Sequence, residues 1–197
     1  PDKFKILERQ TIINDISDGE DVISGLKHSV IKQVKKAIRN DVVVEEAFRP
    51  DELYRVHSVT LKQAGVPITV GEKEYIASLE RFHNLGWVRI FNAIKDSEVC
   101  SSWAILSTGD KAFSWLTGTD PDYYQYGVGH KLVCDVLIKL SSDGIKQFDF
   151  GGANIPGIKR FKESFGGDIT RYQHLESIPG IKGKLYNYLR KLLRRDS

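Results

Sequence analysis

The stretch FDFGGANIPGIKRFKESFGG, residues Phe148–Gly167, carries two glycine pairs separated by a short basic run. It completes the segment Ile145–Phe150, whose apolar residues Ile145, Phe148 and Phe150 predict a buried strand that ends at the first glycine pair. The residues from about Gly157 to Phe165 predict a helix, and Ile169–Leu175 predict a further strand. The stretch therefore predicts a strand, a loop and a helix, followed by another strand.

The letters Asp149-Phe150-Gly151 are those that hold a catalytic magnesium ion in protein kinases. A kinase also needs a glycine-rich loop near its start, a lysine on an early strand and an HRD-type catalytic loop. This chain of 197 residues has none of them, so the kinase interpretation fails. Two interpretations of Asp149 stay open, a capping carboxylate where a strand ends and a residue that binds substrate.

The rest of the chain alternates between helical and strand periodicity. Apolar residues at spacings of three and four predict helices, whereas alternating or continuous apolar runs bounded by turn residues predict strands. In this order the elements predict an α/β (α+β) fold, a mixed and mainly antiparallel sheet flanked by helices. The expected helices are at about 20–39, 50–63, 72–84 and 132–140, and the expected strands are Thr11–Ile16, Val42–Ala47, Trp87–Ile94, Val99–Ser107 and Ala112–Gly118.

The three strands from Trp87 to Gly118 predict an antiparallel meander. Gly127-Val128-Gly129 lies between its last strand and an apolar helix. Glycines there free amide N–H groups at the helix N-terminus, where phosphate oxygens bind well. A Rossmann glycine pattern would need glycine at Leu132, and no Walker A sequence follows. We therefore predict a pyrophosphate cradle, with Gly127, Val128, Gly129, His130 and Lys131 as its residues. An ordinary turn remains the alternative.

These motifs together resemble the FemABX-like branch of the GNAT acyltransferase superfamily. The resemblance covers about Val42 to Leu175. The residues that carry it are Thr119–Tyr124, the Gly127-x-Gly129 turn, Asp149–Gly152 and the run Arg160-Phe161-Lys162-x-x-Phe165-Gly166-Gly167.

The resemblance implies transfer of an acyl group to an amine-bearing acceptor, with no permanently bound cofactor. GNAT enzymes take the acyl group from acyl-CoA, whereas FemABX enzymes take an aminoacyl group from charged tRNA and attach it to a peptidoglycan precursor. The acyl-CoA signature places Gln or Arg three residues before its first glycine, where this chain has Tyr124. Both donors stay open.

The resemblance implies roles for residues around the glycine pairs. Lys162 is the expected catalytic cation, which would stabilise the developing oxyanion, and Phe161 would form a wall of the acceptor pocket. Asp149 and Tyr123 are expected to bind substrate. Asp149, Asp122 and His130 are candidates for the base by position. The alternative for Phe161 is a core residue at helical spacing, with Lys162 on a solvated face.

We expect three segments. Residues 1–40 would be a linker or the remnant of a preceding GNAT half, residues 41–178 the acyltransferase domain, and residues 179–197 a basic amphipathic helix. The last segment carries six cations and no acid between Ile181 and Arg195, namely Lys182, Lys184, Arg190, Lys191, Arg194 and Arg195. A non-catalytic module that binds RNA or a membrane surface through the last helix is therefore a further alternative. A second GNAT half or another copy of the chain would be a partner.

Composition restricts the class of protein. Hydrophobic residues make up 41% and charged residues 28%, and the formal charge of +3 does not by itself imply binding to nucleic acid. No apolar run reaches the length of a membrane span and the first residues lack a signal-peptide core. Cys100 and Cys134 stand apart from the scattered histidines, so we expect reduced thiols, no metal site and a cytoplasmic location.

Overall fold

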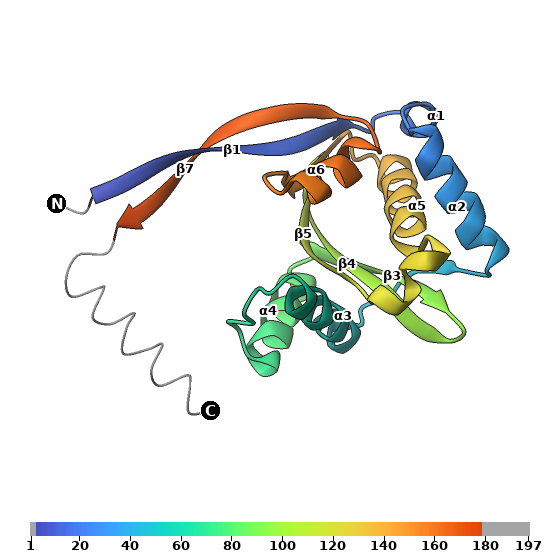
Figure 1. The fold of residues 1–197 in the computed structure, drawn as a ribbon, viewed down its shortest axis with the longest axis horizontal. Coiled ribbons are helices and arrows are strands. Elements are labelled where there is room, and N and C mark those ends of the chain that lie inside the picture. Colours follow the sequence, from blue (N-terminus) through green and yellow to red (C-terminus); the bar gives the residue numbers. More distant parts are fainter. Residues whose placement is uncertain (1–2, 179–197) are drawn as a thin grey trace.

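A seven-stranded sheet runs through the computed structural model, which describes residues 3–178. The strand order is β2-β3-β4-β5-β6-β1-β7, and helices cover both faces (Figure 1). The mixed α/β fold with a mostly antiparallel sheet is therefore confirmed. The strands are β1 (Lys3–Asp15), β2 (Val43–Glu46), β3 (Val88–Lys95), β4 (Glu98–Thr108), β5 (Lys111–Thr119), β6 (Gln147–Gly152) and β7 (Asp168–Ile178).

The helices divide between the two faces of the sheet. Helix α5 is the largest contributor to one core, where its apolar residues pack with Phe148 and Phe150 of β6, and α2 lies against it. Leu53 of α3 and Leu79 of α4 pack on Ile90 and Ala104 in the core of the opposite face. The helices are α1 (Gly19–Ser24), α2 (His28–Arg39), α3 (Pro50–Gln63), α4 (Glu72–Asn84), α5 (Val128–Ser142) and α6 (Pro156–Glu163), with a short 3-10 helix η1 (Pro121–Tyr126) before α5.

Strands β5 and β6 form the parallel pair of the sheet, and they stay paired only at their beginnings. The paired residues are Lys111 with Gln147, Ala112 with Phe148 and Phe113 with Asp149. Beyond them β5 continues along β4 and β6 continues along β1, so the two strands diverge. We call the opening between their C-terminal ends the splay. It leaves main-chain groups of both strands without a neighbouring strand.

The predicted helix over residues 20–39 is two helices, so this prediction was wrong in extent. Helix α1 ends at Ser24 and α2 begins at His28. In the break, the N–H of Lys27 donates to the carbonyl of Ser164, 3.0 Å away, just after α6. This long-range hydrogen bond holds the two helices at an angle that the local apolar spacing does not reveal.

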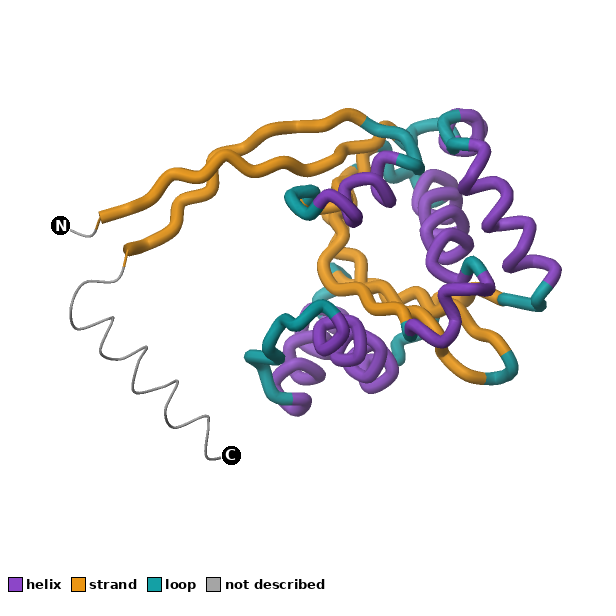
Figure 2. The backbone as a smooth tube through the Cα atoms, viewed as in Figure 1, coloured by secondary structure: helices purple, strands orange, loops and turns teal. Residues whose placement is uncertain are grey.

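The first strand is longer than Thr11–Ile16. Strand β1 pairs with β7 from Lys3 onward, whereas β6 pairs only with its last residues, Thr11–Asp15. The first part of β1 and the last part of β7 therefore form a two-stranded ribbon that extends from the body of the molecule (Figures 1 and 2). Residues 3–15 thus belong to the same sheet as the rest, while the assignment of residues 1–40 to a former GNAT half stays a prediction.

Other predictions match the structure closely. The three-stranded meander is formed by β3, β4 and β5, and the predicted helices at 50–63 and 72–84 are α3 and α4. The predicted basic helix at 179–197 lies outside the described residues. Within residues 3–178, no helix has the length and apolar character to cross a membrane, and no three His, Cys, Asp or Glu residues group as metal ligands would.

Candidate functional site

Lys162 lies where β6 ends at the splay. Its Nζ donates to the carbonyls of Phe150 at 2.6 Å, Gly152 at 2.8 Å and Gly151 at 3.3 Å. An ammonium group has three donors, so all three are engaged by main-chain oxygens. Burial lowers the pKa of Lys162 to about 8, and the nearby Asp149 carboxylate opposes part of that shift. The positive charge thus holds the glycine-rich end of β6.

The Asp149 side chain caps the glycine-rich end of β6. Its Oδ1 accepts a hydrogen bond from the N–H of Gly151 at 2.7 Å and another from the hydroxyl of Thr11 on β1. Oδ2 has no hydrogen bond within residues 3–178. Asp149 therefore combines a capping role with one carboxylate oxygen left for a ligand. Thr11 was not predicted, because its contact with Asp149 joins residues far apart in the chain.

Phe161 of α6 and Phe165, just after α6, contact His130 in the first turn of α5. The ring of His130 lies 5.0 Å from the ring of Phe161 and 5.8 Å from that of Phe165. Phe165 is fully buried and packs near Phe150, whereas 36% of Phe161 is exposed. Burial lowers the pKa of His130, which favours the neutral ring. The structure thus brings His130, Phe161 and Lys162 to one end of the splay.

The glycine turn begins α5. Gly127 has φ 75°, in the left-handed region, and a β-carbon there would lie 2.5 Å from the carbonyl oxygen of Gln33 on α2. The main-chain N–H groups of Val128, Gly129 and His130 have no acceptor within residues 3–178. Such a first turn favours an anion. The Nζ of Lys131 is 2.6 Å from Asp135 Oδ2, so its cation is already paired.

The side chains of Tyr123 and Tyr124, before the turn, contact other parts of the protein. Tyr123 is partly buried against the core beneath η1, with its ring 6.2 Å from that of Tyr126. The hydroxyl of Tyr124 donates to Gln63 Oε1 of α3 at 3.2 Å. Tyr124 thus ties η1 to α3 at the position where the acyl-CoA signature has Gln or Arg.

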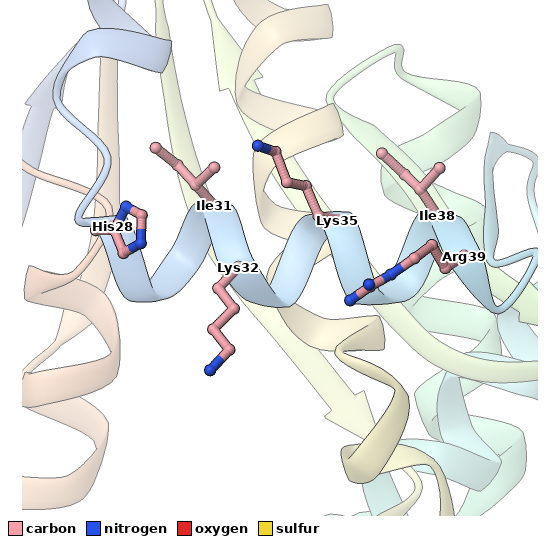
Figure 3. A pocket seen from close by; sticks show the side chains of 6 residues that line it. All are labelled: His28, Ile31, Lys32, Lys35, Ile38 and Arg39. Atoms are coloured by element: carbon pink, nitrogen blue, oxygen red, sulfur yellow. The ribbon is translucent and has the colours of Figure 1, made fainter.

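Helix α2 lies against this turn at Gln33 and presents an exposed basic surface on the side away from its buried residues Val30 and Ala37. Lys32, Lys35 and Arg39 lie on it at helical spacing, and none of them forms an ion pair within the described residues. We call these three residues the α2 basic row. Together with His28, Ile31 and Ile38 they line a shallow depression of about 450 Å³ (Figure 3). The sequence had indicated only a solvated basic side of a packed helix.

A groove of about 470 Å³ lies on the face of the sheet that α3 and α4 partly cover. It was not predicted, because strands far apart in the sequence supply its walls. Asp149 faces it from β6, and Phe113 faces it from β5. Its main lining residues are Ile13, Trp87, Leu106, Lys111, Phe113 and Asp149.

Solved structures share this fold at low sequence identity. FemX has a TM-score of 0.72 with 12% identity, over 85% of this chain and 62% of that one. The C-terminal domain of a protein named as a lysylphosphatidylglycerol synthetase of Agrobacterium fabrum has a TM-score of 0.67 with 16% identity, over 96% and 66%. L-PGS of Bacillus licheniformis has a TM-score of 0.64 with 12% identity, over 95% and 66%. The chain thus spans about two thirds of each, and the FemABX-like resemblance is confirmed as a fold.

The family itself is shown by sequence. No curated protein matches the chain. The family model described as "Acetyltransferase (GNAT) domain" matches residues 29–163, which include α2, the glycine turn, the splay and Lys162. The divergence of the parallel strands and the glycine turn at the start of α5 lie inside the matched region. The chain therefore belongs to the GNAT family of acetyltransferase domains.

Proposed function

We propose that this chain transfers an aminoacyl group from an aminoacyl-tRNA to an amine acceptor at the splay. The FemABX-like fold supports this donor, and so do the names of two neighbours, lysylphosphatidylglycerol synthetase and FemX. Family membership supports acyl transfer in general. The choice of tRNA over acyl-CoA rests on the cations of the α2 basic row.

The α2 basic row supplies cations that form no ion pair within the described residues, on the side of α2 away from its buried Val30 and Ala37. Tyr124 is bonded to Gln63 and Lys131 to Asp135, so the positions expected to hold a coenzyme's phosphates supply no free side-chain cation. Helix α2 contacts both η1 and α5, and its exposed face from His28 to Arg39 spans roughly 16 Å at 1.5 Å per residue. A row of that length matches an extended phosphate backbone better than a single pyrophosphate.

The chemistry needs few groups. The neutral amine nitrogen attacks the ester carbonyl of the aminoacyl-tRNA, a C–N bond forms, and the ester C–O bond breaks. The proton lost by the nitrogen ends on the departing ribose oxygen. Lys162 would stabilise the oxyanion formed in between by exchanging its 3.3 Å bond to Gly151 for one to that oxygen. The neutral His130 and the Asp149 carboxylate are the candidates for carrying the proton.

An acyl-CoA-dependent N-acetyltransferase is the second candidate. The free N–H groups of Val128, Gly129 and His130 at the start of α5 favour it, because they form an anion site without any side chain. A pyrophosphate bound there would use the same turn.

The test compares the two donors by binding. Fluorescence anisotropy measures the affinity for labelled tRNA at several salt concentrations, and calorimetry measures the affinity for CoA. We expect tRNA binding, weakened in Lys32→Gln/Lys35→Gln, with the slope of log K against log salt reduced by about 1.4–1.8 for two lost phosphate contacts. Lys62→Gln/Lys73→Gln is the matched control, because these exposed lysines on α3 and α4 carry the same charge on the opposite face.

Three outcomes separate the candidates. Weaker tRNA binding in the α2 variant alone supports the proposal, and formation of an aminoacylated amine from charged tRNA completes it. CoA binding without tRNA binding supports the acetyltransferase. Equal tRNA affinity in both variants rejects the role of α2. Lys162→Ala should abolish transfer while tRNA still binds, and unchanged turnover would reject its role.

A further inference from the structure

The groove on the α3–α4 face lies opposite the elements assigned to the donor. Helix α5 packs on Phe148 and Phe150 on one face of the sheet, and α2 lies against α5. Asp149, between these two phenylalanines in β6, points to the opposite face. The donor and a ligand in the groove would therefore approach the splay from opposite faces. That separation is what a transfer between two bound substrates requires.

Three side chains meet at the end of the groove beside the splay. Asp149 is in register with Phe113 of β5 and with Ile13 of β1. Residues paired across strands share a face, so these three side chains stand side by side. A β-carbon on Gly151 would lie 3.5 Å from the Phe113 ring, which shows that this ring reaches the glycine-rich end of β6. A ligand held by Asp149 and Phe113 thus ends at the splay.

The groove has an apolar body and a single anionic end. Trp87 is 50% exposed and Phe113 is 41% exposed, which are large fractions for rings that face a concave surface. Leu106 and Ile13 complete the apolar lining. Asp149 is half-buried, and its Oδ2 has no hydrogen bond within the described residues. Lys111 lies two residues before Phe113, about 7 Å away along the strand, so the far end of the groove is positive.

We propose that this groove binds the acceptor, a primary amine on an aliphatic or aromatic body. The ammonium group pairs with Oδ2 of Asp149, and the apolar body lies on Phe113 and Trp87. The inference rests on the proposed function for calling this ligand an acceptor. The binding itself needs neither donor nor turnover.

Charge selects the amine over similar molecules. A carboxylate or phosphate would be repelled by Asp149 at the end beside the splay, where the nearby Lys162 cation is already engaged by three main-chain carbonyls. A hydroxyl gives a single neutral hydrogen bond, which is weaker than one between charged groups. The ring of Phe113, which is paired with Asp149, adds attraction for a cation at its face. A second cation on the ligand would meet Lys111, so a monoamine fits better than a diamine.

The test is a titration followed by ¹H–¹⁵N NMR on the whole chain, with hexylamine, 1-hexanol and hexanoate as probes. We expect saturable shifts at the amides of Phe113, Gln147 and Gly151 for hexylamine and about tenfold weaker binding of hexanol. Hexanoate should cause no shift at Gly151, because its carboxylate would lie at Lys111. Asp149→Asn keeps an oxygen for Thr11 and Gly151 and replaces Oδ2, so it should weaken hexylamine about tenfold or more.

Two further variants make the result decisive. Asp51→Asn removes the same charge from an exposed residue outside the groove and should leave the affinity unchanged. Phe113→Ala leaves the Asp149 hydrogen bonds in place, and we expect it to weaken all apolar probes while keeping the preference for the amine. Equal affinity for hexylamine and hexanol, or unchanged affinity in Asp149→Asn, overturns the proposal. Amine binding without tRNA binding would reject the donor and leave the groove assignment intact.

Discussion

At the scale of single residues, Lys162 couples charge to stability. Burial lowers its pKa to about 8, below the ordinary lysine value of 10.5. Between these pH values the unfolded chain holds more protons on this residue than the folded chain, so the Lys162 contribution to the free energy of unfolding rises with pH. Below pH 8 the cost of burying the charge is fully present.

We expect the difference in unfolding free energy between the wild type and Lys162→Met to change between pH 7.5 and pH 10. The wild type should gain stability relative to the variant as pH rises, because only the wild type loses a buried charge. Urea denaturation at the two pH values measures this. Comparing the two proteins cancels the opposite effect of the buried thiols, whose pKa values are raised by burial. Parallel pH profiles would show that Lys162 keeps its ordinary pKa.

Thr11 stabilises the end of β6 through its hydroxyl. It is 6% exposed, contacts Asp149 Oδ1, and has its Oγ1 2.9 Å from the carbonyl of Gly151. Thr11→Val keeps the shape and removes the hydroxyl, so we expect a loss of about 1–3 kcal/mol in unfolding free energy. Thr170→Val, at the exposed residue paired with Thr11 on β7, should change it by less than about 0.5 kcal/mol. A similar loss in both variants would contradict a special role of Thr11.

At the scale of elements, Gly127 lets α2 lie directly on the first turn of α5. Gly127→Ala would add backbone strain of about 1–2 kcal/mol and also an overlap with the Gln33 carbonyl. Gly65→Ala is the matched control, since Gly65 has a similar φ of 66° and open space around it. We expect the Gly127 variant to lose clearly more unfolding free energy in urea than the control. Equal losses would mean that α2 moves away freely.

Much of the element order was readable because strands and helices have different apolar periods. The meander follows from alternation bounded by turns such as Thr108-Gly109-Asp110, and α5 follows from its apolar residues. Features set by long-range contacts were not readable. The break between α1 and α2 depends on a bond from Lys27 to Ser164, and the groove depends on Asp149 meeting Phe113 and Ile13.

The candidate site shows the same division. Lys162 and the glycine turn were predicted from sequence motifs. The engagement of Lys162 by three carbonyls and the contact of Gly127 with α2 required the fold. The outer part of β1 was missed, because it pairs only with β7, which is far away in the sequence. Phe4 and Ile6 in this part are 58% and 62% exposed.

At the scale of the whole molecule, the β1–β7 ribbon carries an exposed apolar pair. Ile6 faces Leu175 across the two strands, and both side chains are 62% exposed. Exposed apolar residues on a ribbon favour association between copies. We expect Ile6→Thr/Leu175→Thr to shift sedimentation at high concentration toward the monomer. Its melting temperature should stay close to that of the wild type, and a drop of several degrees would show that another part of the chain covers the pair.

The position of β1 between β6 and β7 has a consequence for how the chain reaches this structure. Strand β1 joins the sheet only after residues 147–178 have been made, because both of its neighbours come from there. Contacts between such distant segments slow folding, since the intervening loop must close first. We expect the meander with α3 and α4 to fold early and the insertion of β1 to be the late, slow step. During synthesis the apolar residues of β1 would then remain unpaired until β6 and β7 have been made.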